Sequence, residues 1–310
     1  MAHVLVTGAT GFIGPKLVRR LRERGDGVRA YVRDARKARA VLGPDVELVT
    51  QLAALSPDET VDAIVNLAGA SIAGGLWTAR RRRVLLESRL GVTRELLELC
   101  ARLEKKPETW INASAIGYYG ARTSDEPLDE SAEPGAGFQA ELCRRWEDAA
   151  AQAAAHGVHV SALRFGVVLG NDGGALPQFA RPIRLYAGTV LGTGRQWFSW
   201  IHVEDLLELV LFVLGRRTLT GALNATAPEP VRAEAFMRAL ASALRRPLWP
   251  VRFPAPIVRG ALGELAELFV DGQRVVPARA LALGFRFAHP EIEGALRQLL
   301  APADDATRRA

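Results

Sequence analysis

The 310-residue chain contains few cysteines, few lysines and no long apolar run. Its two cysteines, Cys100 and Cys143, are too few for a disulfide framework, so we expect a protein of the reducing cytoplasm. No apolar stretch reaches the roughly 18 residues of a transmembrane helix. The first residues begin a strand directly, so no signal peptide is expected. No Cys and His cluster has metal-ligand spacing, so no metal site is expected.

Lysine is almost absent, because only four of the 40 basic residues are lysine and 36 are arginine. The net charge is +6, and residues 1–110 hold all of this excess, with 19 basic and 13 acidic residues. Arginine binds phosphate through two parallel hydrogen bonds, so the excess indicates a phosphate-rich ligand. Nucleic acid is not expected, because the arginine run at residues 80–83 has no interleaved aromatic residues for base stacking.

Apolar segments typical of strands alternate with helical periodicity over the first two thirds of the chain. This alternation predicts an α/β fold, a doubly wound parallel sheet of the dinucleotide-binding Rossmann type. Strands are expected at residues 3–7, 28–32, 46–49, 61–67, 109–113 and 158–165, and helices at 13–24, 78–103 and 138–155.

The pattern is looser after residue 166. Residues 170–200 are rich in Gly, Pro and Trp and are expected to form loops. Helices are expected at residues 202–214, 233–244, 257–269 and 290–300, and a strand at 222–225. We therefore expect a nucleotide-binding domain over residues 1–228 and a smaller C-terminal substrate lobe over residues 229–300, with a frayed tail at 301–310.

The strongest motif is the glycine-spaced turn Thr7-Gly-Ala-Thr-Gly-Phe-Ile-Gly14, between the first strand and the first helix. Gly8 permits a tight turn, Gly11 lets a pyrophosphate approach the backbone, and Gly14 lets the helix pack on the strand. The free N–H groups of the helix N-terminus favour an anion. The turn therefore predicts dinucleotide binding.

The end of the second strand bears on the choice between NAD and NADP. An acidic residue there usually binds the ribose hydroxyl of NAD, whereas a basic residue binds the extra phosphate of NADP. The sequence has both, since Arg33 precedes Asp34. Further cations follow at Arg36, Lys37 and Arg39, so NADP(H) is favoured and NAD(H) stays the alternative. In that alternative Asp34 takes the hydroxyl or caps the next helix, and the cations form a solvated face.

Together these motifs resemble those of the extended and atypical short-chain dehydrogenase/reductases, within the NAD-dependent epimerase/dehydratase family. More narrowly, the chain resembles a branch of nucleoside-diphosphate-sugar-epimerase-like proteins with a C-terminal domain of unknown function, here about residues 247–299. The motifs that carry the resemblance are 7–14 (TGATGFIG), 66–69 (NLAG), 88–89 (SR), 146–147 (WE), 192–197 (GTGRQW), 200–205 (WIHVED) and 272–277 (GQRVVP).

The resemblance implies which residues meet the cofactor. The residues expected to contact it are Gly8, Thr10, Gly11, Phe12, Ile13, Gly14, Val32, Arg33, Leu67, Ala68, Gly69, Arg89 and Val168. Two readings stay open, because Leu67 and Ala68 also suit the core and Arg89 also suits a surface ion pair.

The family's catalytic motif is incomplete in this sequence. A Ser after the fifth strand and a Tyr-x-x-x-Lys on the next helix normally move the proton that accompanies hydride transfer. Ser114 is present, but Gln139 and Cys143 occupy the Tyr and Lys positions. Tyr118 and Tyr119 are the candidate substitutes, and packing against the end of the sheet is their alternative role.

The loops at the carboxyl ends of the strands offer residues for a substrate pocket. The candidates are Trp77, Arg164, Trp197 and Trp200, and core packing is the alternative for the tryptophans. We expect an NADP(H)-dependent oxidoreductase or epimerase-like enzyme for a small or sugar-like substrate, as a monomer or homodimer. A non-catalytic NADP(H)-binding regulator is the alternative.

Overall fold

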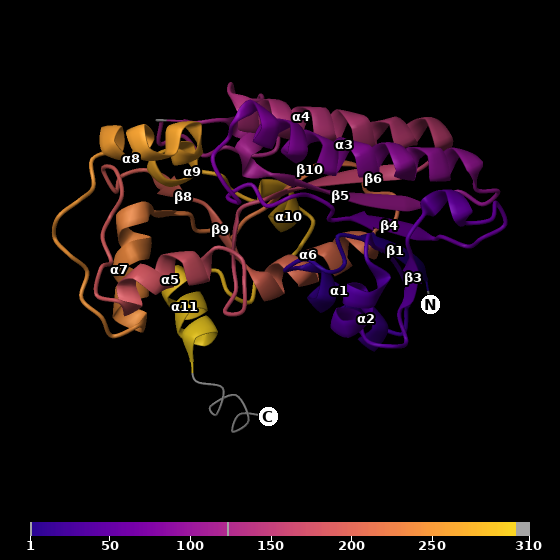
Figure 1. Ribbon diagram of the computed structural model, residues 1–310, viewed down its shortest axis with the longest axis horizontal. Helices are drawn as coiled ribbons and strands as arrows, with labels where there is room; N and C mark the ends of the chain where they lie inside the picture. The colour runs from indigo at the N-terminus through magenta and orange to yellow at the C-terminus, as the bar shows by residue number, and fades with distance from the viewer. Residues whose placement is uncertain (1, 123, 302–310) are drawn as a thin grey trace. The chain divides into compact units, whose positions relative to one another are not determined.

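The computed structural model describes residues 2–122 and 124–301, and it contains a seven-stranded sheet (Figure 1). The strand order is β10-β6-β5-β4-β1-β2-β3, and the neighbours from β3 to β5 are paired in parallel. This order, 3-2-1-4-5-6 with one added strand, is that of the dinucleotide-binding Rossmann fold. The strands are β1 (His3–Thr7), β2 (Gly27–Tyr31), β3 (Glu47–Val49), β4 (Ala63–Asn66), β5 (Thr109–Ala115), β6 (His159–Phe165) and β10 (Gly221–Ala225). The expected fold class is confirmed.

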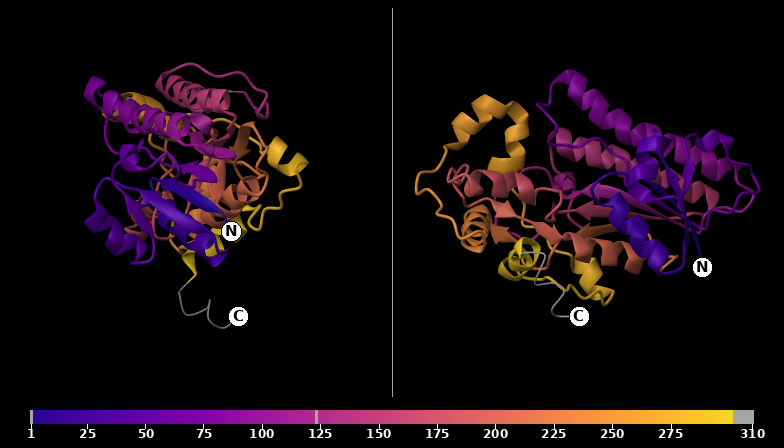
Figure 2. Two further views of the ribbon diagram at one scale, coloured as in Figure 1. Left: turned by 90° about the vertical axis from the view of Figure 1, so that its right-hand side faces the viewer. Right: turned by 60° about the horizontal axis from the view of Figure 1, so that its bottom comes forward.

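Helices cover both faces of the sheet. Helices α3 (Ala79–Arg102) and α4 (Phe138–Ala151) lie on one face, and α1 (Gly14–Glu23) and α2 (Ala35–Leu42) lie on the other (Figures 1 and 2). Between α3 and the sheet lies an apolar cluster that includes Leu5, Ile64, Leu96 and Trp110, all fully buried. Strands covered on both faces must be apolar throughout, which explains the uninterrupted apolar segments in the sequence.

The chain folds as two compact units, and each is assembled from several segments. Unit 1 contains residues 1–118, 134–164 and 207–223, and unit 2 contains residues 119–133, 165–206 and 224–310. The domain boundary expected at residue 228 was inferred from the sequence alone, and it stays a prediction. Of the expected tail, residues 302–310 lie outside the described residues.

Unit 2 holds the remaining elements and a core of its own. They are β7 (Val167–Leu169), α5 (Leu176–Arg184), β8 (Trp197–Phe198), β9 (Trp200–His202), β11 (Val231–Arg232), α7 (Ala233–Ala243), α8 (Ala255–Leu262), α9 (Glu267–Val270), α10 (Ala278–Ala282) and α11 (Ile292–Leu300), with α6 (Val203–Leu214) running from unit 2 into unit 1. The core packs α5, α7 and α11 together, and its largest members are Trp200 and Phe236.

Two expectations for this part of the chain were wrong. Residues 170–200 are not all loop, because α5 forms there with Leu176, Ala180 and Ile183 buried. Its two prolines made this segment resemble a loop in the sequence, although a proline in the first turn of a helix costs no hydrogen bond. The single helix expected over 257–269 is interrupted, because Gly263 adopts φ +56 and ends α8.

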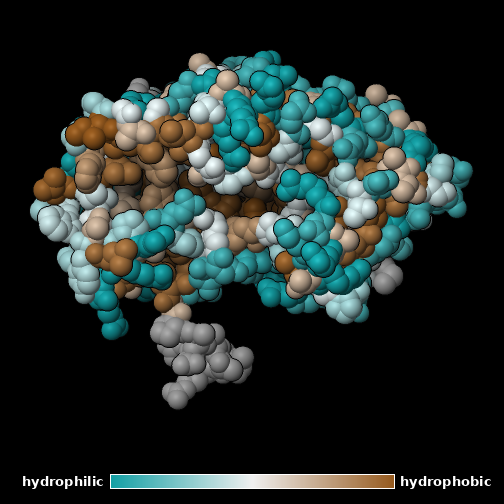
Figure 3. Space-filling view, viewed as in Figure 1, coloured by the Kyte–Doolittle hydropathy of each residue, from teal (hydrophilic) through white to brown (hydrophobic). Residues whose placement is uncertain are grey.

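Large apolar side chains remain exposed beside α8. Trp249, Val251, Phe253 and Ile257 are each more than half exposed. Figure 3 shows apolar colouring at the upper left, where Figure 1 draws α8.

Within the described part of the chain, no helix is both long enough and apolar enough to cross a membrane.

Candidate functional site

The glycine turn lies at the carboxyl end of β1 and leaves no room for side chains at two positions. Gly8 has φ +65, and a Cβ there would lie 2.5 Å from the carbonyl oxygen of Leu67. A Cβ on Gly14 would lie 2.6 Å from the Cα of Ala9, which is closer than such atoms approach. These glycines let the turn fold tightly against β4 and let α1 begin directly behind it.

Helix α1 begins with uncapped N–H groups. Its N-cap residue, Ile13, makes no side-chain capping hydrogen bond, and Pro15 occupies the first turn, where no partner is lost. Gly11 is exposed at the tip of the turn, beside this helix end. Exposed backbone and a positive dipole end together form a surface suited to a pyrophosphate. The residues present therefore fit a bound dinucleotide.

A buried polar network joins the carboxyl ends of β1 and β4 to the middle of β5. The Thr7 hydroxyl donates to Asn66 Oδ1 at 2.6 Å, and Asn66 Nδ2 donates to Asn112 Oδ1 at 2.7 Å. Thr7 also accepts a hydrogen bond from the backbone N–H of Ala68 at 3.2 Å. Because all three side chains are buried, the network holds the ends of β1 and β4 in a fixed arrangement against β5. It orients the loop that carries Leu67 and Ala68.

Arg33 and Asp34 at the end of β2 have different surroundings. Asp34 is the N-cap of α2, where its side chain accepts a hydrogen bond from the backbone N–H of Lys37 at 3.0 Å. Arg33 is exposed, and among the described residues it has no hydrogen-bond or ion-pair partner. Arg39 is structural, because it donates to the carbonyls of residues 43, 44 and 46. The carboxylate that would select NAD thus has a capping role, whereas the guanidinium beside it is available.

Arg89 on α3 lies against the end of β4. Its guanidinium donates to the carbonyls of Leu85 at 3.0 Å and Ala70 at 3.3 Å, and it stacks 5.0 Å from the centre of the Trp146 ring. A Cβ on Gly69 would lie 3.0 Å from the Arg89 guanidinium carbon. Burial lowers the pKa of Arg89, and within the described residues no carboxylate pairs with it. This is a suitable group for an anion or a ribose.

Ser114 at the end of β5 is joined to a carboxylate that the sequence did not indicate as part of the site. Its hydroxyl donates to Glu147 Oε1 at 2.5 Å. Arg164, on β6, donates to the same carboxylate through Nε at 3.0 Å and Nη2 at 2.9 Å. The Arg164 guanidinium also stacks on the Tyr118 ring, 3.4 Å from its centre. The structure thus brings together three predicted residues, Ser114, Tyr118 and Arg164, around Glu147.

The positions that usually hold Tyr and Lys contain groups unsuited to proton transfer. Gln139 lies against Gly117, because a Cβ added to Gly117 would be 3.0 Å from the Gln139 amide oxygen. The side chain of Gln139 is an amide, which does not titrate. Burial raises the pKa of the Cys143 thiol to about 11, and the negative charge of Glu147 adds to this increase. Cys143 is therefore a neutral thiol at physiological pH.

We expect Cys143 to be unreactive in the folded protein. Raising its pKa from 9.0 to about 11 lowers its thiolate fraction near pH 7 about 100-fold. Burial also raises the pKa of Cys100 to about 12, so both thiols should react at least about 100-fold more slowly than in urea-unfolded protein. A thiol-reactive dye followed at pH 7 and pH 10 checks this, and fast labelling of Cys143 at pH 7 would contradict it.

Tyr119 and the candidate tryptophans are more enclosed than expected for open site residues. Tyr119 is fully buried in unit 2, with its hydroxyl 2.7 Å from Asn224 Oδ1. Trp200 is also fully buried, and its indole N–H donates to the carbonyl of Glu229. Trp77 is buried in unit 1 and donates to Ile72. Trp197 is half-buried, with the Arg232 guanidinium 3.8 Å from its ring centre.

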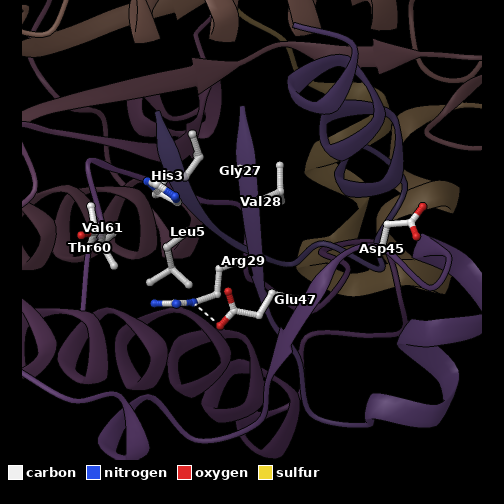
Figure 4. A pocket seen from close by; sticks show the side chains of 10 residues that line it. His3, Leu5, Gly27, Val28, Arg29, Asp45, Glu47, Thr60 and Val61 are labelled. Atoms are coloured by element: carbon white, nitrogen blue, oxygen red, sulfur yellow. Dashed lines mark hydrogen bonds and ion pairs between the residues drawn. The ribbon is translucent and has the colours of Figure 1, made fainter. Parts of the chain in front are cut away.

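A separate pocket lies at the amino ends of β1 and β2 (Figure 4). His3, Leu5, Val28 and the Arg29–Glu47 ion pair, 2.6 Å long, line it. Ligands of parallel α/β sheets bind at the carboxyl ends of the strands, so this pocket lies at the wrong edge for a nucleotide. It is separate from the candidate site.

Comparison with known proteins agrees with this geometry. Residues 4–224 match the NAD dependent epimerase/dehydratase family, and residues 253–299 match a domain of unknown function, DUF1731. The chloroplastic epimerase family protein SDR39U1 homolog of Arabidopsis thaliana is 38% identical over 96% of this chain and 86% of its own length. The epimerase family protein YfhF of Bacillus subtilis is 37% identical over 96% of this chain and 98% of its own length.

Solved structures show the same fold. The human epimerase family protein SDR39U1, crystallised with NADPH, has a TM-score of 0.85 and 31% identity, covering 96% of this chain and 99% of its own. The UDP-glucose 4-epimerase of Thermus thermophilus, in complex with NAD, has a TM-score of 0.75 at 22% identity over 99% of both chains. Sequence, strand order and glycine turn thus agree, and the chain belongs to the NAD-dependent epimerase/dehydratase family.

Proposed function

We propose that the protein is an NADP(H)-dependent oxidoreductase or epimerase-like enzyme acting on a hydroxyl or carbonyl group of a small or sugar-like substrate. The observation that carries the cofactor preference concerns Arg33, which is exposed and unpaired among the described residues. Its neighbour Asp34 has a carboxylate that caps α2. The NADPH of the human relative supports the same preference. NAD(H) is the alternative cofactor, and the cytoplasm stays the predicted location.

The residues we propose for the cofactor are those around the glycine turn and the neighbouring strand ends. When bound, the nicotinamide supplies or accepts a hydride. In this proposal Arg33 binds the phosphate on the adenosine ribose, the turn binds the pyrophosphate, and Arg89 contacts a ribose or phosphate. The full set is Gly8, Thr10, Gly11, Phe12, Ile13, Gly14, Val32, Arg33, Leu67, Ala68, Gly69, Arg89 and Val168.

For catalysis we propose Ser114 and Tyr118, which lie with Arg164 around one carboxylate. Tyr119 is the weaker candidate, because its hydroxyl is engaged in the interior of unit 2. For the substrate, the less enclosed Trp197 is favoured over Trp77 and Trp200. Arg164 acts in this proposal through its carboxylate partner.

The function is tested by NADPH oxidation with a panel of aldehydes, ketones and keto-sugars, and by NADP⁺ reduction with the matching alcohols. We expect turnover, and we expect Ser114→Ala to lower it about 100-fold or more, the usual size of a general acid–base contribution. Ser161→Ala is the matched control, because this buried serine of β6 donates only to the Leu219 carbonyl. It should retain the wild-type rate. Tight NADPH binding without any turnover would overturn the enzyme proposal.

One observation favours a second function, a non-catalytic NADP(H)-binding regulator. Gln139 and the neutral Cys143 thiol replace the residues that usually move the proton. A regulator predicts NADPH binding that is unchanged by Ser114→Ala, and no turnover in either direction. The panel therefore separates the two functions.

A further inference from the structure

Ser114, Glu147 and Arg164 form a connected chain of side chains shielded from solvent. Ser114 is 3% exposed, and the side chains of Glu147 and Arg164 are 13% and 5% exposed. The carboxylate accepts three hydrogen bonds, one from the serine and two from the guanidinium. Two parallel bonds from a guanidinium hold a carboxylate in one orientation. Glu147 is therefore an oriented hydrogen-bond acceptor directly behind Ser114.

This arrangement determines the direction of the Ser114 hydroxyl. A serine hydroxyl has one proton and two acceptor lone pairs. Since the proton points to Glu147 Oε1 at 2.5 Å, the lone pairs of Ser114 Oγ can only accept hydrogen bonds, and the neutral Cys143 thiol lies within hydrogen-bond reach of the same side chain. A group that approaches Ser114 must therefore be a donor, as the hydroxyl of an alcohol is.

Helix register explains why Glu147 reaches this serine. Positions 139, 143 and 147 of α4 are four residues apart and share one face of the helix. Gln139 and Cys143 stand where the family usually has its proton-transferring pair, and an amide and a neutral thiol are unsuited to that role. Glu147 lies one turn further along the same face and places a carboxylate against Ser114.

We propose that Glu147 is the positioning residue and proton acceptor of this site, acting through Ser114; this rests on the oxidoreductase function proposed above. The cofactor, held by the glycine turn, would supply the hydride acceptor for the alcohol carbon. The alcohol oxygen would pass its proton to Ser114 Oγ. At the same time the Ser114 proton passes to Glu147, which becomes a neutral carboxyl group. The C–H and O–H bonds break, and a carbonyl, NADPH and a protonated Glu147 form. Reduction of a carbonyl follows the reverse path.

The first test needs no substrate. An infrared difference spectrum between the wild type and Glu147→Gln isolates the bands of this side chain. At pH 7 we expect an ionised carboxylate band, and we expect Ser114→Ala to shift it because one hydrogen bond is lost. Glu141→Gln, a change of an exposed glutamate on the same helix, is the control for the subtraction. A band of a neutral carboxyl group at pH 7 would overturn the proposal, because Glu147 could then accept no proton.

The second test uses a substrate found with the panel, and it measures alcohol oxidation against pH. We expect Glu147→Gln to lower kcat about 100-fold with KM within about threefold, and to change the pH profile of kcat, because a proton acceptor is lost. The double variant with Ser114→Ala should be no slower than the slower single variant. Glu141→Gln should behave as the wild type.

NADPH affinity separates failure of this proposal from misfolding and from failure of the proposed function. Glu147→Gln leaves Arg164 without its counter-charge, so Ser114→Ala, which keeps that pair, is the second probe. If the wild type turns over substrate and Glu147→Gln binds NADPH normally and keeps its kcat and pH profile, Glu147 has no such role and the oxidoreductase stands. If the wild type turns over nothing, both proposals are overturned.

Discussion

Replacing Arg33 by alanine is expected to weaken NADPH binding about 10- to 150-fold, the effect of losing a hydrogen bond to a charged phosphate. Binding of NADH should change by less than about threefold, because NADH has no phosphate on its adenosine ribose. The reason lies in the structure: Arg33 is exposed with no partner among the described residues, whereas the neighbouring carboxylate caps α2. Titration of nucleotide fluorescence at fixed ionic strength measures both affinities.

Arg19→Ala is the matched control for this experiment. Arg19 lies exposed on α1 and pairs weakly with Glu23 at 3.9 Å, so its loss removes one positive charge from the same unit without touching β2. It should weaken both nucleotides equally and slightly, by less than about threefold. Equal losses of NADPH and NADH affinity in Arg33→Ala would overturn the preference for NADP(H). They would leave the dinucleotide site itself in place.

Gly8→Ala is expected to abolish nucleotide binding and to lower the free energy of unfolding by about 3 kcal/mol. Two effects combine at this position. The residue has φ +65, which an L-residue adopts only with strain, and the new methyl group would lie 2.5 Å from the Leu67 carbonyl oxygen. The methyl carbon is bonded directly to the backbone that follows β1, and the oxygen belongs to the backbone that follows β4, so neither can move aside without displacing one of these strand ends. Urea unfolding and NADPH titration measure the two effects.

Gly91→Ala provides the control for this glycine substitution. Gly91 lies inside α3 of the same unit, and the nearest atom to its added Cβ is 3.9 Å away. Because alanine is a better helix former than glycine, this variant should gain about 0.5–1 kcal/mol and bind NADPH normally. A Gly8→Ala protein that unfolds at the wild-type urea concentration and binds NADPH unchanged would show that the turn has another conformation.

Periodicity and spacing were sufficient for the sheet but not for every helix. The strands near residues 3–7 and 61–67 could be located because their centres, residues 4–6 and 63–65, are apolar without interruption, as in buried parallel strands. Helix α5 could not, since its prolines are typical of loops and its apolar face becomes evident only against the core of unit 2. The interruption at Gly263 has the same origin, because apolar periodicity continues across a residue whose backbone leaves the helix.

The sequence by itself determined the fold class, the glycine turn and the family, because these depend on local spacing and on residues close together in the chain. It also located Ser114 and showed that the usual tyrosine and lysine are absent. Only the tertiary structure decided which group stands behind Ser114. Glu147 is 33 residues away on a helix, and Arg164 is 17 residues further on a strand, and only folding brings them within 3.0 Å of one another. In the same way, whether Arg33 or Asp34 is available at the end of β2 depended on which side chain the next helix takes as its cap.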